Sequence, residues 1–142
     1  MTLIFQLFFP AIVALISMGL SQIIKIAYFY FIDNKIDFSK LKTAGGLPSS
    51  HSAMVTGLSS AIGLQYGWLS PYFQICIIFA FVVIYDAIGI RQAVGEQACI
   101  LNEILKKENK KEITELLGHT PFEVLIGCVI GISTALLIYN II

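Results

Sequence analysis

Long apolar runs alternate with shorter polar segments along the chain, and this pattern predicts its helices. A transmembrane helix needs about 20 mainly apolar residues, within a range of about 17 to 25. Four runs meet this requirement, and we expect transmembrane helices at about 3–30, 53–69, 71–90 and 123–142. The second run is short and rich in Gly, Ser and Ala, a composition that favours close packing on other helices over contact with lipid.

The segment between the third and fourth runs, 91–119, is too polar to cross a membrane. Its apolar residues recur at helical spacing and include Ile100, Leu101, Ile104 and Leu105. We expect an amphipathic helix on the membrane surface, a polar break near Asn109 and a short second helix that ends at Gly118. The predicted fold is all-α: one integral membrane domain over 1–142, a polytopic bundle of four transmembrane helices with one or two surface helices.

Composition points to the same class of protein. The chain is 57% hydrophobic and 13% charged, whereas a soluble domain carries about 25% charged residues. The N-terminal apolar run has no basic segment before it and is too long for a secretory signal, so we expect it to be retained as a helix. The zero net charge argues against a nucleic-acid partner, and the spacing of the three cysteines indicates neither a zinc site nor a disulfide framework.

The basic residues gather on one predicted side of the membrane. They are Lys25, Lys35, Lys40, Lys42, Arg91, Lys106, Lys107, Lys110 and Lys111. All of them lie at the end of the first span or in the loops 31–50 and 91–119. Positively charged loops stay in the cytoplasm. We therefore expect both loops to be cytoplasmic and both termini to be outside, in the plasma membrane of a bacterium.

Two polar stretches, GGLPSSHSA and GHTPFE, fall on this cytoplasmic face, and each leads into a predicted helix. Each also contains one of the chain's two histidines, His51 or His119. The N-terminus of a helix attracts anions, because unpaired N–H groups and the positive end of the helix dipole lie there. With a serine N-cap at Ser49 or Ser50, the two helix starts would form a phosphate pocket at the depth of the lipid headgroups.

Two histidines on one face allow a division of labour in phosphoryl chemistry. One imidazole can attack phosphorus as a nucleophile, and the other can protonate the leaving alkoxide. Glu123, four residues after His119, is placed to bond the second ring nitrogen of that histidine and to fix its tautomer. TPFE also matches a capping box, in which Glu123 would bond the backbone of Thr120 instead. The alternative for each histidine is a structural role.

Four further polar residues lie near the ends of predicted spans, where ionisable groups are costly unless paired or functional. Asp86 and Arg91 bracket the end of the third span. They could form an ion pair with each other, or Arg91 could clamp a phosphate through its planar guanidinium. Gln22 and Lys25 share a helical face. They could point into the same pocket, or Lys25 could extend to the headgroups as an anchor for the helix end.

Three segments together resemble the divergent PAP2 family, a membrane branch related to type 2 phosphatidic acid phosphatases and vanadium haloperoxidases. The segments are GGLPSSHSA, YDAIGIRQAVGEQACILNEI and ELLGHTPFEVLIG, and the resemblance runs from about Gln22 to Gly131. It implies a PAP2/haloperoxidase-like core in which His119 is the nucleophile that forms a phosphohistidine. Glu123 would orient it and His51 would be the general acid. The implied phosphate ligands are Lys25, Ser49, Ser50 and Arg91, with Asp86 and Gln22 as structural or substrate-binding residues, and neither metal nor cofactor is implied.

The chain departs from the parent superfamily in several positions. No Arg-Pro pair precedes the second motif, Ser50 replaces a glycine, and Glu123 replaces an aspartate. The parent core has six helices, so the surface helices or a second copy in a homo-oligomer would complete it. We therefore expect a lipid-phosphate phosphatase at the cytoplasmic leaflet, whose partners are the lipid substrate and membrane lipids. The alternatives are a non-catalytic protein that binds anionic headgroups or assists assembly, and, third, a transporter.

Overall fold

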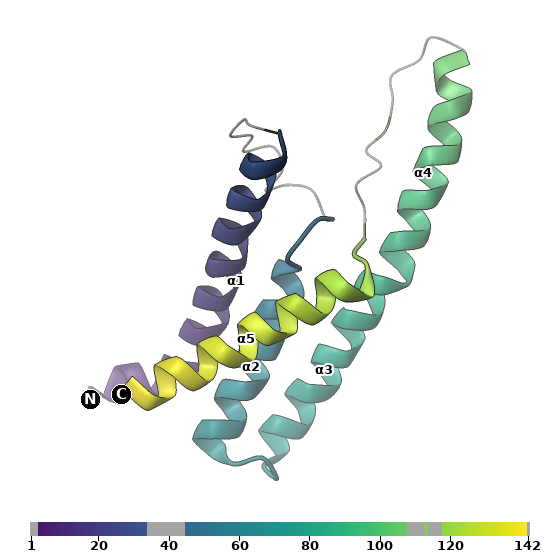
Figure 1. The fold of residues 1–142 in the computed structure, drawn as a ribbon. Coiled ribbons are helices and arrows are strands. Elements are labelled where there is room, and N and C mark those ends of the chain that lie inside the picture. Colours follow the sequence, from purple (N-terminus) through teal and green to yellow (C-terminus); the bar gives the residue numbers. More distant parts are fainter. Residues whose placement is uncertain (1–2, 34–44, 108–112, 114–117, 142) are drawn as a thin grey trace.

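The computed structural model describes residues 3–33, 45–107, 113 and 118–141, and this part of the chain is helical with no strand (Figure 1). The helices are α1 (Leu3–Asp33), α2 (Ser50–Tyr66), α3 (Pro71–Ile88), α4 (Ile90–Lys107) and α5 (Pro121–Ile141). The predicted class, an all-α membrane bundle, is confirmed. The helix starts differ slightly from the prediction, because Ser49 and Ser70 cap α2 and α3 with their side chains and so fix where each helix begins.

Three helical stretches are long and apolar enough to cross a membrane: Gln6–Ile32, Pro71–Lys107 and Pro121–Ile141. The remaining predicted span, α2, has only 17 residues and a polar composition, and most of its residues are buried. It packs against α1, α3 and α5. The short, small-residue helix therefore forms the centre of the bundle, as its composition indicated.

Close contact between α2 and α5 depends on glycine. A Cβ atom at Gly131 would overlap the Thr56 hydroxyl and the Ala53 carbonyl oxygen, and Gly57 faces Ser17 of α1 in the same way. The hydroxyls in these interfaces mostly bond the carbonyl one turn earlier in their own helix. Examples are Ser17 to Val13 at 2.8 Å and Thr56 to Ser52 at 2.7 Å. These hydroxyls can therefore line the bundle interior with a hydrogen bond to their own helix.

The two ends of the chain lie together at one end of the bundle (Figure 1). The rings of Phe9 and Tyr139 are 6.1 Å apart, and the Gln65 amide donates a 2.6 Å hydrogen bond to the Gln6 carbonyl. The opposite end holds the start of α2, the end of α3 and the start of α5 (Figure 1). Both polar stretches of the sequence thus meet at this second end, and its orientation toward the cytoplasm stays a prediction.

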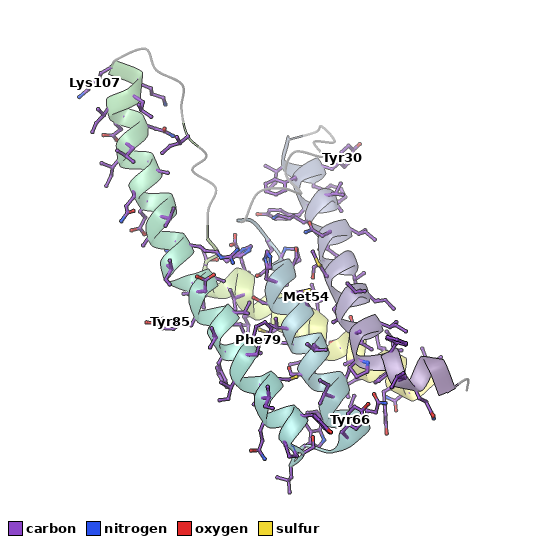
Figure 2. All side chains as sticks on the ribbon, turned by 180° about the vertical axis from the view of Figure 1, so that it is seen from behind. Tyr30, Met54, Tyr66, Phe79, Tyr85 and Lys107 are labelled. Carbon is purple, nitrogen blue, oxygen red and sulfur yellow. The ribbon has the colours of Figure 1, made fainter. Side chains whose placement is uncertain are left out.

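Helix α4 covers much of the segment in which we expected an amphipathic helix, and its position on the membrane surface stays a prediction. It follows α3 after Gly89 and extends away from the bundle, with Lys107 at its far end (Figures 1 and 2). Together α3 and α4 form a stretch of 37 residues, about 55 Å long and well beyond the ~30 Å hydrocarbon core. The amide of Asn102 binds both the N–H and the carbonyl of Ile113, each at 2.8 Å. The predicted break near Asn109 and most of the second short helix fall on residues outside the described part.

Candidate functional site

The starts of α2 and α5 are joined through their main chains. The Ser49 N–H donates a 3.1 Å hydrogen bond to the carbonyl of Glu123. One turn further along α5, Gly127 faces the Ser49 carbonyl, and a Cβ atom there would overlap it. Ser49 is the N-cap of α2, and its hydroxyl lies 2.8 Å from that of Ser52, while Ser50 is buried as the first helical residue. Two helix N-termini, each with a positive dipole end, therefore lie side by side.

The loop before α2 brings Lys25 of α1 to this point. Gly46 has a φ of +93°, a left-handed conformation that glycine adopts without strain. A Cβ atom there would lie 3.0 Å from the Phe29 ring and 3.3 Å from Cε of Lys25. Lys25 is only 2% exposed. Its side chain thus lies inside the protein against the loop rather than extended toward headgroups.

Backbone contacts with α3 and α4 fix the position of His119. Gly118 has a φ of +88° and packs on the backbone of Arg91 and Gln92, with no room for a Cβ atom. The His119 N–H donates a 3.0 Å hydrogen bond to the carbonyl of Ala87. The ring itself is buried, with 4% of the residue exposed. The stretch GHTPFE is therefore fixed against the junction between α3 and α4.

One oxygen of Glu123 serves both roles considered from the sequence. Oε2 lies 3.1 Å from Nδ1 of His119 and accepts a 3.0 Å hydrogen bond from the Thr120 N–H. The Glu123 N–H donates in return to the Thr120 hydroxyl at 3.3 Å, which completes a capping box. Because a carboxylate only accepts, the contact favours a proton on Nδ1. Nε2 of His119 is then left with its lone pair.

Asp86 and Arg91 form the ion pair that the sequence allowed. Nε of Arg91 donates to the Asp86 carboxylate, and the two side chains are 39% and 31% exposed respectively. Among the described residues, the guanidinium of Arg91 makes this one hydrogen bond. The terminal nitrogens of Arg91 therefore remain available to a further anion, so the ion pair does not exclude phosphate binding.

The two histidines lie within the electrostatic reach of the same charged groups. Burial lowers the pKa of His51, and the positive charges of Arg91 and Lys25 lower it further, while Asp86 opposes them. Burial also lowers the pKa of His119, against the hydrogen bond and charge of Glu123, with smaller lowering effects from Lys25 and His51. Both residues lie outside the three candidate spans. Both imidazoles are therefore neutral at neutral pH, in a site with cations beside them.

Two polar side chains of α1 lie one turn before Lys25. The Ser21 hydroxyl and Oε1 of Gln22 are enclosed and have no hydrogen-bond partner within the described residues. Gln22 was a candidate from the sequence, but Ser21 was missed. Its spacing of four residues from Lys25 was the available signal, because that spacing puts both on one helical face. Asn102 of α4 binds the backbone of Ile113 and so holds that residue against α4.

This arrangement defines a helical membrane protein with two histidines and neighbouring cations at one end of its bundle. The chain belongs to the divergent PAP2 family, whose profile matches residues 9–134, and the predicted resemblance is confirmed. A protein of Bacillus subtilis (strain 168), described as an uncharacterized membrane protein YuiD, is 35% identical over 147 residues. The alignment covers 92% of this chain and 93% of that relative. No solved structure shows a significant match to the chain.

Proposed function

We propose that this protein is a membrane-embedded phosphatase that cleaves a phosphate ester or diphosphate of a lipid through a phosphohistidine, at the cytoplasmic leaflet. The observation that carries the proposal is the pairing of His119 with Glu123 at the point where two helix N-termini meet. Nδ1 of His119 lies 3.1 Å from the carboxylate, so the opposite ring nitrogen is the nucleophile. The charges of Lys25 and Arg91 act on His51, and the charges of Lys25 and His51 act on His119.

In the first step, Nε2 of His119 attacks phosphorus, and a P–N bond forms as the P–O bond to the lipid breaks. His51 gives its proton to the leaving lipid oxygen. Charge on the transferring phosphoryl group is balanced by Lys25, by the terminal nitrogens of Arg91 and by the free N–H groups at the start of α2. In the second step, His51 takes a proton from water, the water oxygen attacks phosphorus, and the P–N bond breaks to release inorganic phosphate.

The general-acid role requires that His51 be protonated when substrate is bound. In the free protein burial lowers the pKa of His51, and the charges of Arg91 and Lys25 lower it further. A bound phosphate dianion offsets these two charges, so the pKa of His51 rises on binding. Substrate binding thus favours the protonated form of His51, which is the form that donates the proton.

The test is phosphate release by the purified protein from phosphatidic acid, phosphatidylglycerol phosphate, and polyprenyl phosphate and diphosphate. His119→Ala and His51→Ala should each lower the rate at least about 100-fold, the scale of one general acid–base group. Asn140→Ala, at the other end of the bundle, is the matched control. A phosphoryl group labile to acid should be trapped on the wild type and be absent from His119→Ala. Unchanged rates in both histidine variants would refute the assigned roles.

The second candidate function is non-catalytic binding of anionic lipid headgroups. Its support is the missing Arg-Pro pair, since the parent superfamily uses that segment in catalysis. It predicts lipid binding that survives His119→Ala, together with no phosphate release by the wild type from any lipid in the panel.

A further inference from the structure

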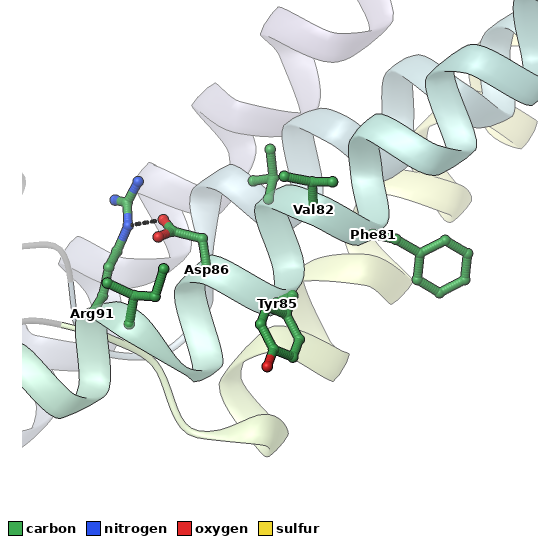
Figure 3. Close-up of a pocket in the computed structure, with 7 residues that line it drawn as sticks. Phe81, Val82, Tyr85, Asp86 and Arg91 are labelled. Atoms are coloured by element: carbon green, nitrogen blue, oxygen red, sulfur yellow. Dashed lines mark hydrogen bonds and ion pairs between the residues drawn. The ribbon is translucent and has the colours of Figure 1, made fainter.

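A groove of about 600 Å³ runs along the outer face of α3 beside the candidate site. Its lining residues include Phe81, Val82, Tyr85, Ile90, Asp86 and Arg91. Figure 3 shows Phe81 toward one end of the drawn set and the Asp86–Arg91 pair at the other. The groove is thus almost entirely apolar along its length and charged at one end.

The setting of the groove favours a hydrocarbon occupant. It lies on the stretch Pro71–Lys107, which is long and apolar enough to cross a membrane. Val82 and Tyr85, in the middle of the groove wall, are 61% and 77% exposed, so this face of α3 borders the lipid. Water in this groove would find few hydrogen-bond partners on the apolar wall, whereas a lipid chain packs against it without loss of hydrogen bonds.

The charged end of the groove adjoins the histidine cluster through direct contacts. The carbonyl of Ala87, next to Asp86, accepts the 3.0 Å hydrogen bond from the His119 N–H. Gly118 packs on the backbone of Arg91. The charges of Asp86 and Arg91 both act on His51. Arg91 therefore belongs to both the groove and the histidine cluster.

Asp86 determines which part of the guanidinium faces the ligand. It engages Nε of Arg91, which leaves the terminal nitrogens for an anion. The carboxylate would itself repel a phosphate dianion, so it favours phosphate binding only while the ion pair is intact. Asp86 therefore orients Arg91 and leaves its terminal nitrogens for an anion.

We infer that this groove is the chain-binding part of the substrate site: it holds a hydrocarbon chain of the lipid phosphate while Arg91 binds the phosphate. The substrate then reaches the histidines sideways from the bilayer, along α3. The substrate class is a long-chain lipid phosphate, and water-soluble phosphate esters are poor substrates. The inference rests on the proposed function for turnover, but binding in the groove is measurable without it.

A photo-crosslinking experiment tests occupancy directly. A benzophenone amino acid replaces Val82 in the groove, or Leu137 on the lipid-exposed face of α5 as a matched control. The full-length protein is placed in nanodiscs that contain a minority of phosphatidic acid in phosphatidylcholine with the same acyl chains. Phosphatidic acid should crosslink at position 82 in excess of its mole fraction by on the order of tenfold, the effect of one charge-assisted contact. At position 137, crosslinking should follow the mole fraction.

Two further variants separate this inference from the proposed function. Enrichment at position 82 should persist in His119→Ala, which cannot turn over, and should disappear in Arg91→Gln. Val82→Gln, which puts a polar amide on the apolar wall without filling the groove, should raise the KM for long-chain phosphatidic acid more than the KM for a short-chain phosphate ester, and Leu137→Gln should change neither. Enrichment without phosphate release in the wild type would refute the phosphatase proposal alone. Equal crosslinking at both positions, with or without turnover, would overturn the groove assignment.

Discussion

Replacing Glu123 separates its two roles, because the same oxygen bonds the Thr120 N–H and Nδ1 of His119. Glu123→Gln keeps an amide oxygen that can accept from the Thr120 N–H, but it removes the negative charge beside the imidazole. Glu123→Ala removes both. Thr120→Ala is the matched control, because it removes the hydroxyl partner of the capping box and leaves the His119 contact in place.

The magnitudes follow from the kinds of hydrogen bond involved. Loss of the cap costs about 1 kcal/mol of unfolding free energy. A hydrogen bond to a charged group contributes about 1.5–3 kcal/mol, equivalent to roughly 10- to 150-fold in rate if it acts in the transition state. The imidazole gains positive charge as its opposite nitrogen bonds phosphorus. Loss of the carboxylate charge therefore affects that state more than the resting one.

The assay pairs phosphate release with thermal unfolding in detergent. Glu123→Gln should unfold like the wild type but react about 10- to 150-fold more slowly. Thr120→Ala should lose about 1 kcal/mol of stability and keep near-normal activity. Glu123→Ala should show both defects. Wild-type activity in Glu123→Gln would mean that the residue only caps the helix, and the orienting role would be refuted.

Four other predictions concern packing, pH and orientation. Gly131→Ala should cost about 1–3 kcal/mol through overlap with Thr56 and with the backbone of Ala53. Gly19→Ala, which meets nothing within 4 Å, should keep or slightly raise stability in the same unfolding assay. Since the pKa of His51 is lowered in the free protein, kcat/KM should fall as pH rises past a value below about 6.5, while the corresponding fall in kcat should come at higher pH. The lowered pKa values of both histidines also mean that the unfolded chain binds more protons, so unfolding free energy should drop as pH falls below about 6.5; a stability flat from pH 7 to 5 would contradict this. In a variant with Cys76 and Cys128 replaced by alanine, the exposed Cys99 should resist an impermeant maleimide in intact cells and react after permeabilisation; labelling in intact cells would reverse the proposed orientation.

Hydrophobic pattern and turn chemistry predicted the helices well, because a run of apolar residues and its capping serine are local features. These local features did not predict that α4 follows directly from α3. That arrangement depends on the backbone at Gly89 and on the hydrogen bond from Asn102 to Ile113. The sequence suggested that GGLPSSHSA and GHTPFE share a face through the distribution of charge. Their actual contact depends on how closely α2 and α5 cross, which is a tertiary property.

The candidate residues show the same division. The Glu123–His119 contact and the Asp86–Arg91 pair join residues four and five positions apart, so spacing alone could suggest them. The burial of Lys25 against Gly46 joins two distant segments, and nothing local indicates it. The four-residue spacing of Ser21 from Lys25 placed it on the same helical face, but its enclosure without a hydrogen-bond partner could be found only from the structure.

The hydrogen bond between the Ser49 N–H and the Glu123 carbonyl joins main-chain atoms only. The alignment of the two histidine-bearing segments therefore depends on main-chain contacts and on the lack of side chains at Gly127 and Gly131. An engineer could exchange the groups around the imidazoles to alter reactivity without disturbing this alignment. A single added methyl group at either glycine would push α2 and α5 apart and so separate the two segments, although both histidines would remain in the sequence.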